Sequence, residues 1–317
     1  MNRPLVGELR FLLALAVLAL WTLLLAPFQW VFTRRPVLRA WPAGATRLPH
    51  LYHRVAAPVI GARIHVHGAL AVERPLLILA NHVSWLDIPV LSAVAPVSFV
   101  AKSEMRDWPL FGWLARAQRT VFVDRKDRRG AGRQADALAR RLEAGDVMVL
   151  FAEGTTSDGS RVLPFNASLL GAASALVRDG TKVMVQPVAL SYTRAHGMAA
   201  GIHGLRPIGW PGTVGLLPHL PDTLREGALD VHVSLAAPIP FEAPAARKRV
   251  AAAAHRAIRD MRARDIRGVP LEPTDDARSR DVPPALTGGA RSRAAPSAPA
   301  DDARFRGVPL EPTVDSG

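Results

Sequence analysis

The chain has 317 residues, of which 49% are hydrophobic, and it carries a formal net charge of +13 at pH 7. This apolar content is ample for a folded core and excludes a wholly disordered protein. The sequence has no cysteine, which excludes disulfides, thiolate metal sites and a cysteine nucleophile. Any group transfer must therefore be direct or use a hydroxyl.

A long apolar segment lies near the N-terminus. Residues 11–32 include no charged side chain, and a helix of that length can cross a bilayer. A cleaved signal peptide would have a shorter apolar region and a small-residue cleavage site. Because Arg34, Arg35 and Arg39 follow the segment, the positive-inside rule predicts a membrane protein whose main domain faces the cytoplasm. Pro27 also permits a bent helix that enters one leaflet without crossing.

The composition changes along the chain and predicts three parts. We expect a membrane anchor at residues 1–40, a folded domain at residues 41–266 and a disordered tail at residues 267–317. The tail is rich in Pro, Ala, Arg and Asp and has no sustained apolar periodicity. The excess positive charge lies ahead of it. Since the chain begins with an anchor and has only two tyrosines, we expect membrane lipid, and not nucleic acid, to be the partner of the basic surface.

Short apolar runs alternate with helical segments through the folded domain. The predicted strands are residues 59–66, 76–80, 97–101, 120–125, 147–152, 182–191 and 229–235. The predicted helices are a segment after residue 82 that runs to about residue 94, and residues 108–117, 130–143 and 245–266. Residues 208–220 are expected to form a loop and a short helix. This alternation predicts an α/β fold with a mainly parallel or mixed sheet flanked by helices.

The second predicted strand, residues 76–80, delivers His82 to an edge of the sheet. If the chain turns helical near Ser84, the five-residue step to Asp87 folds back and its carboxylate reaches Nδ1 of the imidazole. A carboxylate held there fixes the tautomer and leaves Nε2 free as a base. An isolated pair at this spacing is more often a solvated His and Asp beside a helix start, so the other motifs must decide between these interpretations.

Polar residues also follow two other predicted strands. Arg125 closes the strand at residues 120–125, and Glu153 opens a loop, EGTTSDG, after the strand at residues 147–152. A small-residue turn after a parallel strand exposes backbone N–H groups and hydroxyls, which favours an anion. Alone, this loop would be an ordinary turn.

Together these segments resemble four motifs of the glycerolipid acyltransferase family, whose members acylate lysophosphatidate and related lyso-lipids. The matching segments are NHVSWLD at residues 81–87, FVDR at 122–125, FAEGTTS at 151–157 and QPV at 186–188. They occur in the family's order, and the resemblance covers most of the folded domain. Arg119 departs from the pattern, because the second motif usually begins with Gly at that position.

The resemblance implies acyl transfer from acyl-CoA or acyl-acyl-carrier protein to the hydroxyl of a lyso-lipid, without a metal or another cofactor. His82 would act as the base and Asp87 would orient the imidazole. The residues implied in binding the acceptor are Arg125, Glu153, Gly154, Thr155 and Thr156, with Asn81 and Ser84 as second-rank candidates.

Two departures from the family pattern concern the acceptor. Thr156 stands where an arginine usually pairs with the acceptor phosphate, and Asn166 stands where many phosphate-using members carry Lys. These positions and residues 208–220 look more like the branch that includes acyltransferases for lyso-ornithine lipid, an acceptor without phosphate. Because activity on 1-acylglycerol-3-phosphate is commoner in the family, that acceptor, giving phosphatidate, is the first expectation and lyso-ornithine lipid is the alternative.

Two other function classes remain open. A lipid hydrolase could use the same dyad with water as acceptor, but such enzymes usually carry a G-x-S-x-G nucleophile elbow, which does not occur in this sequence. A non-catalytic lipid-binding protein could keep the fold without turnover. The intact His82 and Asp87 argue against this second class.

Overall fold

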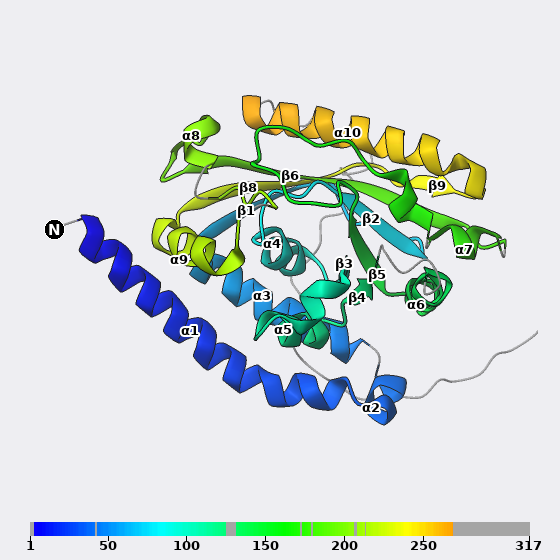
Figure 1. Cartoon of the computed structure of the whole chain (residues 1–317), viewed down its shortest axis with the longest axis horizontal. Coiled ribbons are helices and arrows are strands. Elements are labelled where there is room, and N and C mark those ends of the chain that lie inside the picture. Colours follow the sequence, from blue (N-terminus) through cyan, green and yellow to red (C-terminus); the bar gives the residue numbers. More distant parts are fainter. Residues whose placement is uncertain are drawn as a thin grey trace, which may run out of the picture. The chain divides into compact units, whose positions relative to one another are not determined.

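The computed structural model describes residues 3–268 apart from residues 42, 125–130, 172, 179, 206–207 and 213. The predicted tail therefore lies outside the described residues except for its first two positions. The described residues belong to one compact unit, in which helices lie on both faces of a twisted sheet (Figure 1).

The strands of the sheet are β1 (Ala62–His67), β2 (Leu76–Ala80), β3 (Val97–Lys102), β4 (Val121–Val123), β5 (Val147–Phe151), β6 (Val183–Ala195), β7 (Met198–Ala199), β8 (Leu229–Leu235) and β9 (Ile239–Phe241). Their order is β1-β8-β6-β2-β5-β3-β4, and β7 and β9 also pair with β6. Strand β2 is parallel to both β5 and β6, whereas β8 is antiparallel to β6. The predicted α/β class with a mainly parallel or mixed sheet is confirmed.

The helices are α1 (Arg3–Phe32), α2 (Arg35–Ala40), α3 (Gly44–Ile60), α4 (Asp87–Val94), α5 (Phe111–Ala117), α6 (Ala131–Glu143), α7 (Ala173–Arg178), α8 (Gly201–Leu205), α9 (Leu216–Glu226) and α10 (Arg247–Arg267). Short 3-10 turns occur at η1 (Ser103–Asp107), η2 (Ala167–Gly171) and η3 (Pro244–Ala246).

Strand β2 lies between the two largest of the three hydrophobic cores that the described residues form. All five of its side chains are buried, as expected for a central parallel strand covered on both faces. Leu76, Ile78 and Ala80 join the core that includes residues of α3, α4 and α9. Leu77 and Leu79 join the core that includes residues of α6, α7 and α10. The two cores fix β2, and hence the residues that follow it, in the middle of the sheet.

Several predicted boundaries were wrong, for identifiable reasons. The strand predicted to end at residue 191 continues to Ala195, because it stays paired with β8 as far as Leu229. Residues 59 and 60 end helix α3 and do not begin a strand, because Gly61 caps the helix with φ 104° and β1 starts only at Ala62. The helix predicted from residue 108 begins at Phe111, since Pro109 and Leu110, whose φ is 59°, form a turn ahead of it. Helix α3 itself was not predicted.

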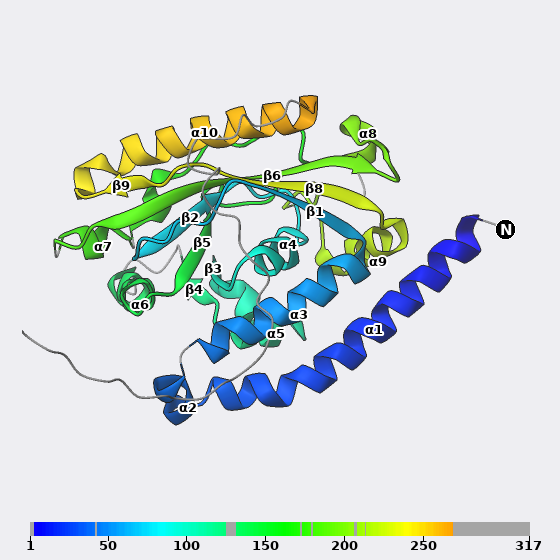
Figure 2. The ribbon, with the colours of Figure 1, turned by 180° about the vertical axis from the view of Figure 1, so that it is seen from behind.

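Helix α1 contains the predicted membrane segment. Residues 5–32 are long and apolar enough to cross a bilayer, and only 6% of the most apolar window is buried. Along its length the helix nevertheless lies beside the folded domain (Figure 2). Arg225 pairs with Glu8 at 2.8 Å near one end, and Nε2 of Gln29 donates to the carbonyl of Ala45 at 3.0 Å near the other. Both ends of α1 are thus fastened to the domain.

Candidate active site

The end of β2 places His82 against the first residue of α4. Nδ1 of His82 lies 2.7 Å from Oδ2 of Asp87, and because the carboxylate can only accept, Nδ1 carries the proton. The chain reverses direction in between, with the N–H of Asp87 donating to the carbonyl of Ser84 at 3.1 Å. The predicted fold-back is therefore present, and Nε2 of His82 is left as the unprotonated nitrogen.

Asp87 is fully buried and its carboxylate accepts several hydrogen bonds. Besides His82, Oδ2 accepts the backbone N–H groups of Val83 at 2.7 Å and Ser84 at 3.0 Å. The hydroxyl of Tyr192, on β6, donates to Oδ1 at 2.7 Å. Hydrogen bonds to the charged form stabilise a buried carboxylate, so these donors compensate for its desolvation.

Tyr192 is the residue of this network that the sequence did not identify. It lies one residue beyond the predicted end of its strand, where it reads as one more apolar position. Burial, and then the charge of Asp87, raise the pKa of Tyr192 well above its ordinary value, which keeps the phenol protonated as a donor. A buried tyrosine requires a hydrogen-bond partner, and that requirement was the available signal in a chain with only two tyrosines.

We expect Tyr192→Phe to lower kcat by roughly 10- to 150-fold, because a hydrogen bond to a charged group contributes about 1.5 to 3 kcal/mol. Tyr52→Phe is the matched control, since it removes a hydroxyl that contacts Oγ1 of Thr22 at 3.0 Å, away from Asp87. Initial rates and thermal unfolding of both variants measure the effect. Equal kcat losses in the two variants would show that the Tyr192 hydroxyl acts only through stability.

The orientation of the His82 ring is fixed as well as its tautomer. Its ring stacks on Phe151, at the end of β5, with centroids 3.8 Å apart and an interplanar angle of 9°. The side chain of His82 remains 16% exposed, whereas Asp87 has no exposure. The dyad therefore presents one edge of the imidazole to the outside and keeps the carboxylate sealed.

The loop after β5 is joined directly to the histidine. The N–H and the hydroxyl of Ser157 both donate to the carbonyl of His82, at 2.9 and 3.1 Å. Gly159 has φ +76° and lies so close to Val83 that a Cβ there would come within 2.9 Å of Cγ1. The third motif and the first motif thus form one connected structure.

Glu153 is buried at the start of this loop. Its Oε1 accepts the N–H of His82 at 3.4 Å. Burial is the largest influence and raises the pKa of Glu153 to about 8; the charge of Asp87 acts in the same direction, while the N–H groups of His82 and Leu163 and the charge of Arg262 oppose it. At neutral pH the carboxyl is therefore mostly protonated and neutral.

This shift predicts how stability depends on pH. The folded pKa of Glu153, about 8, lies above the ordinary value of 4.5, so the native state holds one more proton than the unfolded chain between these values. The free energy of unfolding should therefore be highest below the unfolded pKa and fall by a few kcal/mol as pH rises toward 8. Glu153→Gln should lack this contribution.

Denaturant unfolding of the wild type and Glu153→Gln at a series of pH values between about 5 and 8 isolates this contribution, because all other groups titrate equally in both. The difference between the two curves should grow with pH in favour of the variant. Parallel curves would contradict the raised pKa.

The remaining predicted site residues occupy different environments. Thr155 is exposed, Gly154 has φ +76°, and Thr156 is only 8% exposed. Arg125 lies outside the described residues, so its place in the acceptor site stays a prediction. The side chain of Asn81 exchanges hydrogen bonds of 2.8 and 2.9 Å with the backbone of Leu190 and so joins β2 to β6.

Ser84 is fully buried. Its side chain has 0% exposure, and its N–H donates to Asp87. These contacts indicate that Asn81 and Ser84 help to hold the backbone around the dyad in place. Their predicted roles in acceptor binding stay predictions.

The loop predicted within residues 208–220 also reaches the site. The N–H of Trp210 donates to the carbonyl of Val83 at 2.9 Å, and Gly209 lies against the backbone of Asp158. A Cβ at Gly212 would come within 2.5 Å of Oγ1 of Thr155. Residues 209–212 therefore cover the third motif, and their resemblance to one branch of the family gains a structural location.

His219, in α9, packs between the first motif and the loop at residues 209–212. It is 9% exposed, Nε1 of Trp85 donates to its Nδ1 at 3.3 Å, and its Nε2 lies 3.0 Å from the carbonyl of Gly209. It therefore helps to hold this covering loop against the start of the first motif.

Comparison with known proteins identifies the family of this chain. A family model described as Acyltransferase matches residues 63–191. The lyso-ornithine lipid O-acyltransferase of Brucella abortus is 48% identical over 258 residues, which cover 81% of this chain and 95% of that protein. A 1-acyl-sn-glycerol-3-phosphate acyltransferase of Neisseria gonorrhoeae is 38% identical over 159 residues, or 50% of this chain and 59% of that protein.

The fold agrees with a solved structure as well. The crystal structure of the 1-acyl-sn-glycerophosphate acyltransferase PlsC from Thermotoga maritima superposes with a TM-score of 0.56 at 23% identity, covering 83% of this chain and 99% of that one. At this identity the likeness concerns the fold. With the family model and the extensive identity to the Brucella protein, it confirms the assignment expected from the four motifs: the chain belongs to the glycerolipid acyltransferase family and acts as an acyltransferase on lyso-lipids.

Proposed function

We propose that this protein transfers a fatty acyl group from an acyl thioester to the hydroxyl of a lyso-ornithine lipid. The observation that carries the choice of acceptor is the extent of similarity, 48% identity across nearly all of a lyso-ornithine lipid O-acyltransferase against 38% across little more than half of a 1-acyl-sn-glycerol-3-phosphate acyltransferase. This favours the alternative of the sequence analysis over the first expectation, lysophosphatidate.

Two residues support this choice chemically. Thr156 and Asn166 carry no charge where phosphate-using members usually carry Arg and Lys, so this part of the site offers fewer cations to a phosphate. An ornithine head group is a zwitterion with its own ammonium group, which added cations would repel. The neutral positions suit that head group better.

The dyad geometry supports a direct transfer. Nε2 of His82 takes the proton of the acceptor hydroxyl while the hydroxyl oxygen attacks the thioester carbonyl carbon. The carbon–sulfur bond then breaks, and the thiolate recovers the proton from the imidazolium. Asp87 stays ionised throughout, and its four hydrogen-bond donors keep it in place to stabilise the imidazolium. The donor is an acyl-CoA or an acyl-acyl-carrier protein.

The acceptor head group is assigned to the loop beside the dyad. We place it against Glu153, Gly154 and Thr155, with the buried Thr156 contributing to the shape of the site and with Arg125, which follows β4 in the sequence, as a further predicted contact. A protonated Glu153 would present a neutral carboxyl to the head group. The covering residues 209–212 then limit its size.

Helix α1 is proposed to attach the protein to the membrane. Its outward leucines are largely exposed, including Leu9 at 68%, Leu20 at 70% and Leu23 at 72%. Because both ends of α1 are fastened to the domain, the helix suits immersion in one leaflet alongside the domain better than a perpendicular span. The arginines that follow it favour the cytoplasmic side.

The test is an assay of purified full-length enzyme with both acceptors and the same donor. We expect kcat/KM for lyso-ornithine lipid to exceed that for lysophosphatidate by about tenfold or more, the usual scale of pocket discrimination. His82→Ala, prepared identically, controls for a contaminating activity. Turnover confined to lysophosphatidate would overturn the proposed acceptor.

A further inference from the structure

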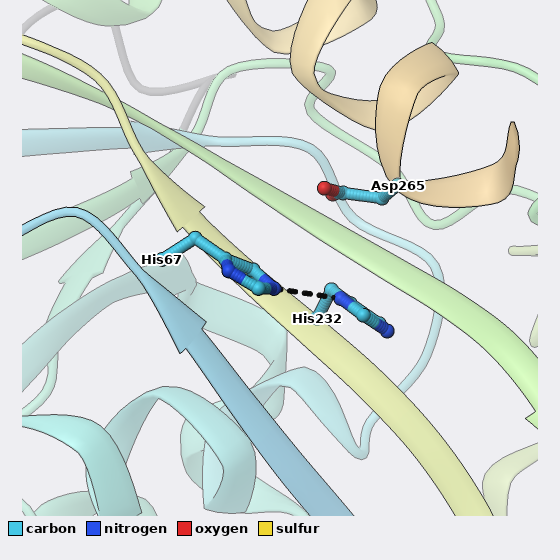
Figure 3. A group of neighbouring side chains, drawn as sticks. All are labelled: His67, His232 and Asp265. Atoms are coloured by element: carbon cyan, nitrogen blue, oxygen red, sulfur yellow. Dashed lines mark hydrogen bonds between the residues drawn. The ribbon is translucent and has the colours of Figure 1, made fainter. Parts of the chain in front are cut away.

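A cluster of histidines lies on the face of the sheet that α10 covers, away from the dyad. Strands β1 and β8 are parallel with His65 beside His232, and alternate residues of a strand share a face. His67 of β1 and His232 of β8 therefore point to the same side (Figure 3). Asp265, in the last turn of α10, approaches them from above the sheet.

The distances within this cluster fit a small ligand. Nε2 of His67 lies 2.8 Å from Nδ1 of His232, and one ring nitrogen from each histidine and one oxygen of Asp265 all lie within 4.8 Å of one another. In a tetrahedral shell with bonds of about 2.0 to 2.1 Å, ligand atoms stand roughly 3.3 Å apart. Small shifts of the half-buried imidazoles would bring all three groups to that spacing.

The three side chains are also oriented by their neighbours. The hydroxyls of Ser191 and Ser234 donate to the carboxylate of Asp265 at 2.7 and 2.9 Å. His65 stacks on His232 with centroids 4.8 Å apart, and its Nε2 lies 3.0 Å from Oδ1 of Asp230. Outer contacts of this kind position the ligands of a metal.

We propose that His67, His232 and Asp265 form a binding site for a divalent transition-metal ion of the Zn²⁺ class. Two imidazoles and one carboxylate favour such an ion over Mg²⁺ or Ca²⁺, which prefer all-oxygen shells. Three protein ligands leave a position for water. Both histidines are partly exposed, so an ion can enter from solvent.

Binding requires a specific tautomer of each ring. The nitrogens that face each other, Nε2 of His67 and Nδ1 of His232, now share a hydrogen bond, and that proton must move so that both lone pairs point at the ion. The proton of His67 then resides on its Nδ1 and that of His232 on its Nε2. The ion would join β1, β8 and α10, three segments far apart in sequence, and so stabilise the fold without contacting the dyad.

The experiment uses full-length, untagged protein in detergent after treatment with a chelator. Equilibrium dialysis against Zn²⁺ should give one bound equivalent with a Kd on the order of 1 µM or lower. Thermal unfolding should shift upward by roughly 5 to 10 °C at a hundredfold excess of Zn²⁺ over Kd. Co²⁺ in place of Zn²⁺ should give the visible absorption of a bound, low-coordinate ion.

His67→Gln and His232→Gln should each weaken Zn²⁺ binding at least about tenfold. His196→Gln is the matched control, because it removes an exposed imidazole that pairs with Glu226 and with none of the three ligands, and it should bind Zn²⁺ like the wild type. Thermal unfolding without Zn²⁺ shows that each variant is folded. The proposal is overturned if the wild type binds no equivalent tighter than about 100 µM, or if the folded His67→Gln and His196→Gln variants bind alike.

Discussion

His82→Ala is expected to abolish acyl transfer while leaving the fold intact. Removal of a general base costs about 10²- to 10⁴-fold in rate. Here the same residue, once protonated, also donates the proton to the leaving thiolate. Initial rates of the purified full-length variant, with thermal unfolding as a check of the fold, measure the effect.

Asp87→Asn is expected to leave a small residual activity. An asparagine can turn its oxygen toward His82 and the N–H groups of Val83 and Ser84, and its amide can donate to the hydroxyl of Tyr192, which also accepts. The local geometry is therefore kept while the negative charge that stabilises the imidazolium is lost.

His65→Ala serves as the control for both variants, because it removes an imidazole on the other face of the sheet. It should retain wild-type rates. A folded His82→Ala enzyme that keeps more than about a tenth of the wild-type rate would exclude His82 as the base.

The sequence was most informative where a strand is buried on both faces. Residues 76–80 were predicted with the boundaries that the structure has, because an apolar run ended by polar residues leaves little choice of length. Residues 229–235, in which apolar and polar side chains alternate, were predicted with the observed boundaries as well. The pattern at residues 76–80 also predicted the position of His82, since a polar residue that follows a buried strand must lie where the strand leaves the sheet.

Helix α3 shows why other parts were not predictable. It contains Pro49 and Pro58, which local rules take as helix breakers, and the apolar Val59 and Ile60 looked like the start of the next strand. The helix is stabilised by packing of Ala57 and Ile60 into the main core. Such tertiary contacts override local preference and are not visible in one sequence.

The candidate site was predictable to the extent that its residues are close in the sequence. The five-residue step from His82 to Asp87 could be interpreted from spacing and motif alone. Tyr192 and the loop at residues 209–212 lie more than a hundred residues further along the chain, and only the order of the strands brings them to the same place. The parallel pairing of β2 with β6 is the step that local patterns do not contain.

Thr156→Arg is expected to shift acceptor preference toward lysophosphatidate. A guanidinium at this position would attract the phosphate and repel the ornithine ammonium, and together these two charged interactions should shift the preference by about 1 to 3 kcal/mol. The ratio of kcat/KM for lysophosphatidate to that for lyso-ornithine lipid should therefore rise by roughly 5- to 150-fold. Purified variant and wild type assayed with both acceptors give this ratio directly.

The structure makes a control for size essential. Thr156 is only 8% exposed, and the next residue, Ser157, holds the carbonyl of His82, so a larger side chain could disturb the dyad by overpacking. Thr156→Met adds comparable length without charge. Because an overpacking effect lowers the rates with both acceptors, it largely cancels in the ratio, whereas the effect of charge does not. A rise in the ratio with Arg but not with Met would place the selecting charge at this position, and equal ratios in the two variants would show that the acceptor head group does not reach it.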